Sequence, residues 1–313
     1  MPAYIRSTGI LIPHKNEDGT TFRCQKPEIK EFIDPKESRR FSGIIKNGVF
    51  AGMTALKNGG IRKPDAIITG TGLGCLSDTI KFISSIKQGG EENLNPAPFI
   101  YSTHNTVGGT ISILTGCTGY NSTFVHRGIS FESALFESFL ISCEEPELNI
   151  LCGGVDEMTN EYLVIAERIG LHRENSIPGE GAGFVVLSGK KEGSVAEVSD
   201  IKTVPVIDKM QTVKHFREFI EKNSINPAKT VIFTPFNGDS ECDNWKKDVL
   251  KSYKWINIVN PKEVTGEFMT AGALSTVMAV DLIIKDPQIK QVLVWNSFLN
   301  MENAFIFIKN GSI

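Results

Sequence analysis

The strongest constraint on the fold of this chain is the alternation of short apolar runs with longer segments of helical period. In the first part of the chain, the runs typical of buried strands are residues 66–69, 122–125, 149–152 and 183–187. Segments with helical spacing lie between them, at residues 78–87, 106–115 and 131–142. Strands that alternate with helices predict an α/β protein whose sheets are covered on both faces.

The same alternation returns after about residue 189. Strands are expected at residues 195–198, 230–234, 255–259, 291–296 and 304–309, and helices at residues 213–222, 242–252 and 270–284. We therefore expect two halves, residues 1–189 and 190–313, that form one compact unit.

The composition is that of an ordinary globular protein. The 313 residues are 41% hydrophobic and 22% charged, which provides enough apolar surface for a large buried core. The formal net charge is −3 and the basic residues are scattered, so nothing favours nucleic acid as a partner. No apolar run approaches the roughly 20 residues that span a bilayer, and the N-terminus lacks a signal-peptide pattern. The sequence thus predicts a cytoplasmic protein without a membrane span.

The six cysteines show no paired or metal-type spacing. Four of them, Cys75, Cys117, Cys143 and Cys152, have apolar or glycine neighbours. This pattern predicts free buried thiols in a reducing compartment. The run GTGLGC at residues 70–75 lacks the spacing and the following acid of a dinucleotide fingerprint. We therefore expect neither a bound metal nor a cofactor.

Five motifs occur in a fixed order along the chain. They are GTGLGCL at residues 70–76, NPAPFIYSTHNTVGGTISI at 95–113, LTGCTGYN at 114–121, LCGGVDEM at 151–158 and PGEGAGFVVL at 178–187. In order and spacing they resemble the β-ketoacyl synthases, the condensing enzymes of the thiolase-fold superfamily. The resemblance extends over about residues 65–309. It implies a thiolase-like fold with two pseudo-duplicated halves in a five-layer αβαβα arrangement.

Residues 119–138 predict a strand-to-helix elbow, which presents one side chain at a helix N-terminus, where an anionic nucleophile is stabilised. In the family, a catalytic cysteine lies there and two histidines assist decarboxylation of the malonyl extender. The cysteine position falls on Gly128 and its downstream serine on Ser130. No cysteine occurs between Cys117 and Cys143, so a small shift in register does not restore the nucleophile.

Both histidine positions are replaced as well. Phe236 takes the first and is followed by Asn237, which either donates a hydrogen bond or simply belongs to a turn. Glu267 takes the second, although Lys262 and Gly266 of the same motif are kept. The Glu267 carboxylate is either a residual base or an acid at a helix N-cap or first turn.

The C-terminal motif departs in the same direction. The chain reads NSFLNMENA from residue 296, and residues 299–302 stand where the family has a glycine-rich turn. In the family, those glycines let backbone segments approach each other closely, and their turn helps to form the oxyanion hole. Together with the other replacements, this change implies a site without the Cys-His-His set.

A replaced chemistry is an alternative. His126, Ser130 and Glu267 would form a Ser/His/Glu set if they cluster, with Asn237 as a further polar group. Against this, His126 lies on the strand side of the elbow, where its side chain is expected to point into packing. Phe131 and Phe298 are expected at an acyl pocket or its gate.

The leading hypothesis is a catalytically silent ketosynthase-like subunit, similar in role to the chain-length factors that pair with an active ketosynthase in type II polyketide systems. Fatty acid and aryl-polyene pathways are further settings for such a subunit. The implied partners are an active β-ketoacyl synthase, in a heterodimer, and an acyl carrier protein. Two other classes stay open. One is an acyltransferase or hydrolase that acts on carrier-protein thioesters through Ser130 and Glu267, and the other is a non-catalytic acyl-binding or scaffolding homodimer.

The resemblance also implies a subunit interface, because the thiolase fold dimerises through edge strands near the nucleophile helix. It places that interface at residues 103–113 and 121–129. His104, Asn105, Asn121 and Phe124 are the side chains expected there.

Overall fold

The computed structural model describes residues 2–90, 94–205 and 208–311. Within these residues, ten strands form one mixed sheet in the order β10-β9-β11-β12-β8-β1-β7-β6-β4-β5, and β2 and β3 form a separate ladder. The strands are β1 (Ala3–Leu11), β2 (His14–Lys15), β3 (Phe22–Arg23), β4 (Ala66–Gly70), β5 (Asn121–Phe124), β6 (Ile150–Asp156), β7 (Gly181–Ser188), β8 (Ala196–Pro205), β9 (Val231–Phe233), β10 (Asn257–Val259), β11 (Gln291–Phe298) and β12 (Glu302–Asn310). The helices are α1 (Pro35–Ser38), α2 (Gly43–Asn58), α3 (Leu76–Gly89), α4 (Pro96–Tyr101), α5 (Thr106–Thr115), α6 (Ser130–Glu144), α7 (Asn160–Arg168), α8 (Lys209–Lys222), α9 (Ser240–Lys251), α10 (Lys262–Thr265) and α11 (Ala271–Lys285).

The order of the strands repeats between the two halves of the chain. From the centre of the sheet outward, the first half reads β1-β7-β6-β4-β5 and the second half reads β8-β12-β11-β9-β10. Each series is therefore the first, fifth, fourth, second and third sheet strand of its half. The two series join where β1 pairs antiparallel with β8. This repeat is the pseudo-duplication that the sequence implied. The division into residues 1–189 and 190–313 stays a prediction, and it falls in the connection between β7 and β8.

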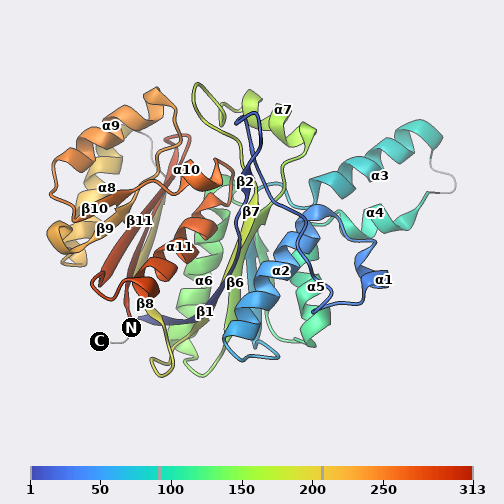
Figure 1. Cartoon of the computed structure of the whole chain (residues 1–313), viewed down its shortest axis with the longest axis horizontal. Coiled ribbons are helices and arrows are strands. Elements are labelled where there is room, and N and C mark those ends of the chain that lie inside the picture. Colours follow the sequence, from blue (N-terminus) through green and yellow to red (C-terminus); the bar gives the residue numbers. More distant parts are fainter. Residues whose placement is uncertain (1, 91–93, 206–207, 312–313) are drawn as a thin grey trace.

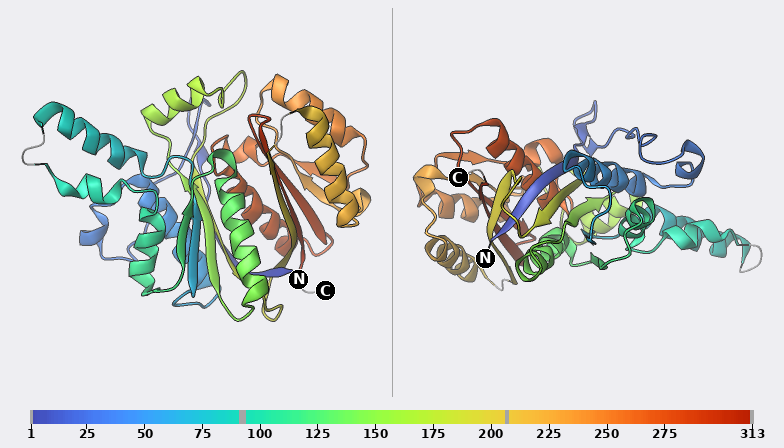
Figure 2. Two further views of the ribbon diagram at one scale, coloured as in Figure 1. Left: turned by 180° about the vertical axis from the view of Figure 1, so that it is seen from behind. Right: turned by 90° about the horizontal axis from the view of Figure 1, so that it is seen from below.

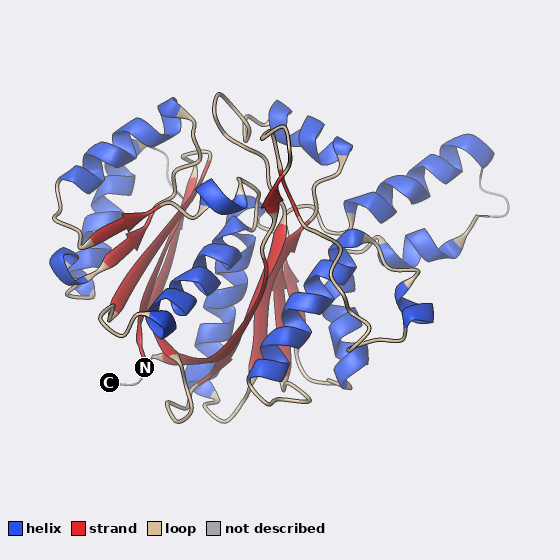
Figure 3. Ribbon diagram, in the orientation of Figure 1, coloured by secondary structure: helices blue, strands red, loops and turns tan. Residues whose placement is uncertain are grey.

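Three apolar cores separate five layers (Figure 1, Figure 3). Helices α2 and α5 cover the outer face of the first half-sheet around Ile67 and Phe184. Helices α6 and α11 lie between the two half-sheets, where Ile68 is buried. Helices α8 and α9 cover the outer face of the second half-sheet around Trp295 and Phe305. The α/β class and the αβαβα arrangement are thus confirmed.

The inner strands are buried on both faces, which explains how their sequences could be recognised. On β11, Val292 and Val294 pack in the central layer, whereas Leu293 and Trp295 pack towards α8 and α9. All of β11 except Gln291 is buried. A strand enclosed on both faces reads as a continuous apolar run rather than as alternation. Such runs were the signal that predicted β4, β6, β7, β9 and β11.

The N-terminal segment contains the main elements that the sequence did not predict. Strand β1 lies at the centre of the sheet and pairs with β7 and β8. Helix α2 packs on it so closely that a Cβ on Gly9 would lie 2.1 Å from the carbonyl oxygen of Ala51. The glycines of α2 lower its helical propensity, yet Gly52 leaves room for Ile111, which a Cβ there would approach to 2.8 Å. Close packing, not propensity, therefore fixes this helix.

Helix α3 forms where the period predicted it, but its apolar face is not enclosed by the core. Helices α3 and α4 project from the body of the molecule (Figure 1, Figure 2). Ile83 and Phe99 are each 57% exposed. The Phe82 and Phe99 rings pack on each other, with centroids 5.0 Å apart. The helical period thus predicted the element but not its burial.

Candidate functional site

The expected strand-to-helix elbow is present. Strand β5 ends at Phe124, a 3₁₀ turn covers Arg127–Ile129, and α6 begins at Ser130. Arg127 has a φ of 52°, in the left-handed region that non-glycine residues seldom adopt. Its Nη2 lies 2.9 Å from Oε1 of Glu302, which ties the elbow to β12. The elbow holds Gly128 buried at the N-terminus of α6.

Phe298 occupies the space that a side chain at position 128 would need. A Cβ built on Gly128 would lie 2.2 to 2.4 Å from Cδ2, Cγ and Cβ of Phe298. Phe298 is the last residue of β11 and is only 3% exposed. A thiol at position 128 therefore requires Phe298 to move. The packing leaves no room for a thiol at position 128 without that movement.

The two phenylalanines expected at an acyl pocket or its gate are both buried. Phe131 has no exposed surface and belongs to the central apolar core, and its place at an acyl pocket stays a prediction. Phe298 belongs to the same core and is packed onto Gly128. The short spacing between Phe131 and the elbow could not distinguish a pocket wall from the core behind it.

The alternative Ser/His/Glu set is not assembled by hydrogen bonds among the described residues. Ser130 is fully buried, and its Oγ donates to the carbonyl oxygen of Arg127 and accepts the backbone N–H of His126, both at 2.8 Å. The His126 ring is exposed, with Nδ1 3.0 Å from Oγ of Ser133, so the expectation that it points into packing is wrong. The Ser130 hydroxyl therefore closes the 3₁₀ turn that precedes α6, through local bonds to the backbone of the kind that serine commonly makes.

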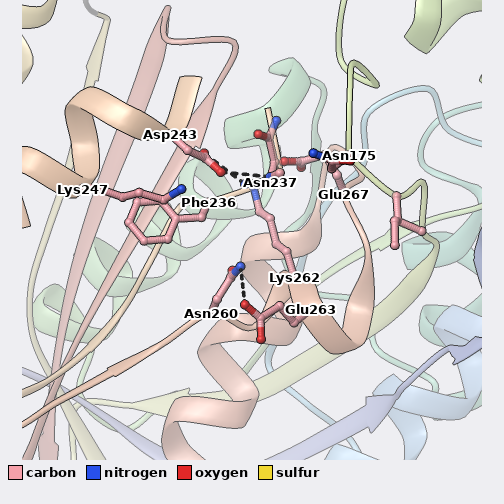
Figure 4. A pocket seen from close by; sticks show the side chains of 11 residues that line it. Asn175, Phe236, Asn237, Asp243, Lys247, Asn260, Lys262, Glu263 and Glu267 are labelled. Carbon is pink, nitrogen blue, oxygen red and sulfur yellow. Dashed lines mark hydrogen bonds and ion pairs between the residues drawn. The ribbon is translucent and has the colours of Figure 1, made fainter. Parts of the chain in front are cut away.

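Phe236, Asn237 and Glu267 meet at one pocket of about 250 Å³, which lies where β9 and β10 end beside α9 and α10 (Figure 4). It is lined by Asn175, Ile177, Phe236, Asn237, Gly238, Asp243, Lys247, Asn260, Lys262, Glu263 and Glu267. The structure thus brings together the two replaced histidine positions. None of the described residues that line this pocket is a cysteine or a histidine.

Glu267 forms a buried ion pair in this pocket. Its Oε2 lies 2.6 Å from Nζ of Lys262, and both side chains are almost fully buried. Loss of hydration raises the pKa of Glu267, and the Lys262 ammonium opposes that rise. Helix α11 has Thr270 as its N-cap, so the expectation of Glu267 as a cap or first-turn acid is corrected. The carboxylate is committed to Lys262 rather than free to take a proton from a substrate.

The other wall of the pocket joins a turn to a cation. Asn237 Oδ1 accepts the N–H of Asp239 at 3.1 Å, which confirms that this segment is a turn. The Asp243 carboxylate accepts the N–H groups of Asn237 and Gly238 at 3.2 and 2.9 Å. The Lys247 ammonium lies 5.5 Å from the centroid of the Phe236 ring, within range of a cation–π interaction. Sequence reasoning missed Asp243 and Lys247, since both belong to a helix that reads as a charged surface.

A third residue that the sequence did not single out is Asp156, at the end of β6. Its Oδ1 accepts hydrogen bonds from the Thr71 hydroxyl at 2.9 Å and from the Gly72 N–H at 2.8 Å. Its Oδ2 accepts hydrogen bonds from the Thr270 N–H at 2.9 Å and from the Thr270 hydroxyl at 2.8 Å. Burial raises the pKa of Asp156, although all four hydrogen bonds favour the ionised form. One carboxylate therefore joins the loop after β4 to the start of α11, and its sequence signal was its place in the motif LCGGVDEM at the end of an apolar strand.

The turn that lost its glycines keeps a glycine-like backbone. Leu299 and Asn300 have φ values of 50° and 55°. Glycine adopts this region readily, whereas other residues are strained there. Asn300 Nδ2 donates to Sγ of Cys242 at 3.3 Å, so the replaced turn now contacts α9.

The residues expected at a subunit interface lie around a free sheet edge. Strand β5 is the last strand of the sheet on its side. Asn121 is exposed and its Nδ2 donates to the carbonyl oxygen of Gly108 at 3.1 Å, while Phe124 is half-buried beside the His126 ring. His104 and Asn105 are exposed just before α5. The interface itself stays a prediction.

Two further searches covered the part of the chain that the structure describes. No helix there is both long and apolar enough to cross a membrane. No group of three or more His, Cys, Asp or Glu side chains there is placed to hold a metal ion.

The sequence matches no protein-family model, and no curated protein matches it. Solved structures do match, each over 99% of both chains. One is AntDE:AntF, a type II PKS acyl-carrier protein in complex with its ketosynthase bound to the hexaketide, with a TM-score of 0.81 at 16% identity. The ishigamide ketosynthase/chain length factor gives 0.76 at 13%, and a beta-ketoacyl synthase from Burkholderia phymatum STM815 gives 0.77 at 13%. The chain therefore has the thiolase-type fold of the ketosynthases.

Proposed function

We propose that this chain is a catalytically silent ketosynthase-like subunit that pairs with an active β-ketoacyl synthase, as chain-length factors do. The observation that carries the proposal is the packing of Phe298 into the space of a side chain at position 128. A lost cysteine alone would leave a cavity at the elbow. Here a buried aromatic ring, that of Phe298, lies in the space that such a side chain would take.

The rest of the site supports the same reading. Condensation requires a thiolate that accepts the acyl chain and groups that stabilise charge or transfer protons. Phe236 offers neither, and Glu267 is engaged with Lys262. The Ser130 hydroxyl is buried with two backbone partners, so an acyltransferase or hydrolase built on Ser130 and Glu267 loses its support.

The partner surface that we propose is the free edge of β5 together with the outer face of α6. An unpaired strand edge is a ready template for a strand of another chain. Beside it, Phe136 and Leu140 are 38% and 41% exposed, one turn apart on α6, and Tyr120 is 50% exposed before the strand. We propose an active ketosynthase on this surface and an acyl carrier protein as the donor to the pair. Polyketide, fatty acid and aryl-polyene biosynthesis are the candidate settings.

Co-expression with an active β-ketoacyl synthase tests the proposal. We expect a heterodimer by size-exclusion chromatography with light scattering, and condensation by the pair but not by this chain alone. The double variant Phe136→Glu/Leu140→Glu is expected to abolish the pairing without loss of folding, because both side chains are exposed. Val164→Glu, at another exposed apolar residue on α7, is the matched control and should pair normally.

Two outcomes would count against the proposal. Decarboxylation of malonyl carrier protein by the isolated chain would contradict catalytic silence. A stable homodimer that does not exchange with any ketosynthase would instead favour the scaffolding alternative.

A further inference from the structure

A second cavity, of about 390 Å³, lies between the segment around α1 and the C-terminal end of α5. These elements are on the opposite side of the molecule from α9 and α10, which border the pocket of Phe236 and Glu267 (Figure 1). Ile33 and Phe41 line one side of this α1–α5 groove, and Tyr101, Ile113 and Leu114 line the other. The Phe41 and Tyr101 rings meet edge to face, with centroids 5.7 Å apart. The walls are therefore mainly aromatic and aliphatic.

Ile113 is the anomalous residue of the α1–α5 groove. It is 84% exposed, whereas Ile33 is buried and Phe41, Tyr101 and Leu114 are half-buried. A large aliphatic side chain left in water forgoes the favourable free energy of its burial. An exposed isoleucine at the lip of an apolar cavity is the side chain that an apolar ligand would cover.

The rim of the α1–α5 groove carries two cations, Lys36 in α1 and Arg40 in the turn that follows it. Lys36 and Arg40 are exposed, and neither has an ion-pair partner among the residues that the structure describes. Glu37 is the acid on the same rim, so the local charge of these three side chains is one positive unit. An apolar cavity beside unpaired cations matches a ligand with an apolar body and an anionic head.

We propose that the α1–α5 groove binds an amphipathic anion, an aliphatic chain that ends in a carboxylate. A methylene group occupies about the 30 Å³ of a water molecule, so a chain of about ten carbons fits the cavity. The chain lies against Phe41, Tyr101 and Ile113, and the carboxylate lies at Lys36 and Arg40, where the guanidinium fork suits two oxygens. The isolated chain contains every residue that forms the site, and the test uses that chain because Ile113 also falls at the end of residues 103–113, which are expected at the subunit interface.

Titration calorimetry of the isolated chain with decanoate, below its micelle concentration, tests the site. We expect saturable binding of one decanoate. The double variant Lys36→Ala/Arg40→Ala is expected to weaken decanoate binding about tenfold or more, the range of a charged hydrogen bond, while binding of the uncharged analogue decanol stays the same. Ile113→Asp is expected to abolish binding of both compounds. Lys251→Ala and Val164→Asp, at exposed residues elsewhere, are the matched controls.

Three results would overturn this assignment. The first is the absence of saturable binding. The second is equal binding of decanoate and the cation decyltrimethylammonium, which would remove the role of Lys36 and Arg40. The third is an Ile113→Asp variant that changes the oligomeric state but not decanoate binding, which would make the groove part of a protein interface.

Discussion

Gly128 and Phe298 form one structural unit at the residue scale. The glycine has no side chain, and the phenylalanine ring lies within 2.2 Å of the place where a Cβ would be. A side chain at position 128 would clash with the ring, and loss of the ring would leave a void. A cysteine at position 128 would therefore need Phe298 to move.

Gly128→Cys is expected to destabilise the protein by about 1–3 kcal/mol, since it overpacks the core against Phe298. Phe298→Ala is expected to cost about 3–5 kcal/mol through the cavity that it leaves. The double variant should be less destabilised than the sum of the two, because the thiol then occupies part of that cavity. Urea unfolding measures all three free energies.

The control for this cycle is Gly109→Cys on α5, where an added Cβ meets nothing within 4 Å. That change should combine additively with Phe298→Ala. Additivity of Gly128→Cys with Phe298→Ala, to within about 0.5 kcal/mol, would show that the two residues do not share the space.

At the scale of elements, Asp156 connects three segments that are far apart in the sequence. Its two oxygens accept hydrogen bonds from the loop after β4 and from the residue before α11, and it lies at the end of β6. A buried carboxylate with four donors orders the backbone around it, since each of those donors would otherwise lack a partner. The position of α11, and with it of the nearby Lys262 and Glu267, depends on this junction.

Asp156→Asn is expected to lower the free energy of unfolding by about 3 kcal/mol, because the amide nitrogen faces donors that need an acceptor. Thr270→Val, which removes one of the four donors, should cost about 1 kcal/mol. Thermal unfolding followed by circular dichroism compares both with Asp248→Asn, an exposed residue on α9. Equal melting temperatures for Asp156→Asn and Asp248→Asn would contradict the junction role.

At the scale of the whole molecule, Glu132 lies in the helical layer between the two half-sheets. This α6 residue has no exposed surface. Its Oε1 accepts a hydrogen bond from the Nδ2 amide of Asn296, on β11, at 2.8 Å. A Cβ on Gly272 of α11 would lie 1.9 Å from the same oxygen. Burial raises the pKa of Glu132 to about 7, against opposing hydrogen bonds and the Lys262 charge.

This raised pKa predicts a pH dependence of stability. In the unfolded chain Glu132 ionises near 4.5, and in the folded protein near 7. Between these values the folded state binds more protons, so stability falls as pH rises, by up to about 3 kcal/mol above pH 7. Glu132→Gln keeps an acceptor for Asn296 and removes the charge. It should be more stable than the parent protein at pH 8 and similar to it at pH 4.5.

The measurement is denaturant unfolding of both proteins at several pH values, with Glu144→Gln, an exposed residue of the same helix, as the control. The stability difference between Glu132→Gln and the parent protein should grow with pH. A difference that stays constant from pH 4.5 to pH 8 would show that Glu132 does not titrate in this range.

The sequence by itself determined the fold class and the five motifs, and it predicted a site without the Cys-His-His set. Apolar runs that are buried on both faces keep their strand signal whatever surrounds them, and a missing cysteine or histidine is visible without coordinates. Glycine-rich α2 and the paired centre strand β1 escaped detection because packing, rather than local propensity, fixes them.

Only the tertiary structure decided what replaced the lost groups. Phe298, which packs on Gly128, lies 170 residues from it in the sequence. Lys262 forms an ion pair with the Glu267 carboxylate. The Ser130 hydroxyl donates a hydrogen bond to the Arg127 carbonyl oxygen, just before α6. Each outcome depends on which side chains meet across the layers and on how deeply they are buried. Local sequence predicts neither which distant side chains meet nor how deeply they are buried. Contacts between distant segments set both the space available to a side chain and the free-energy cost of an unpaired buried charge.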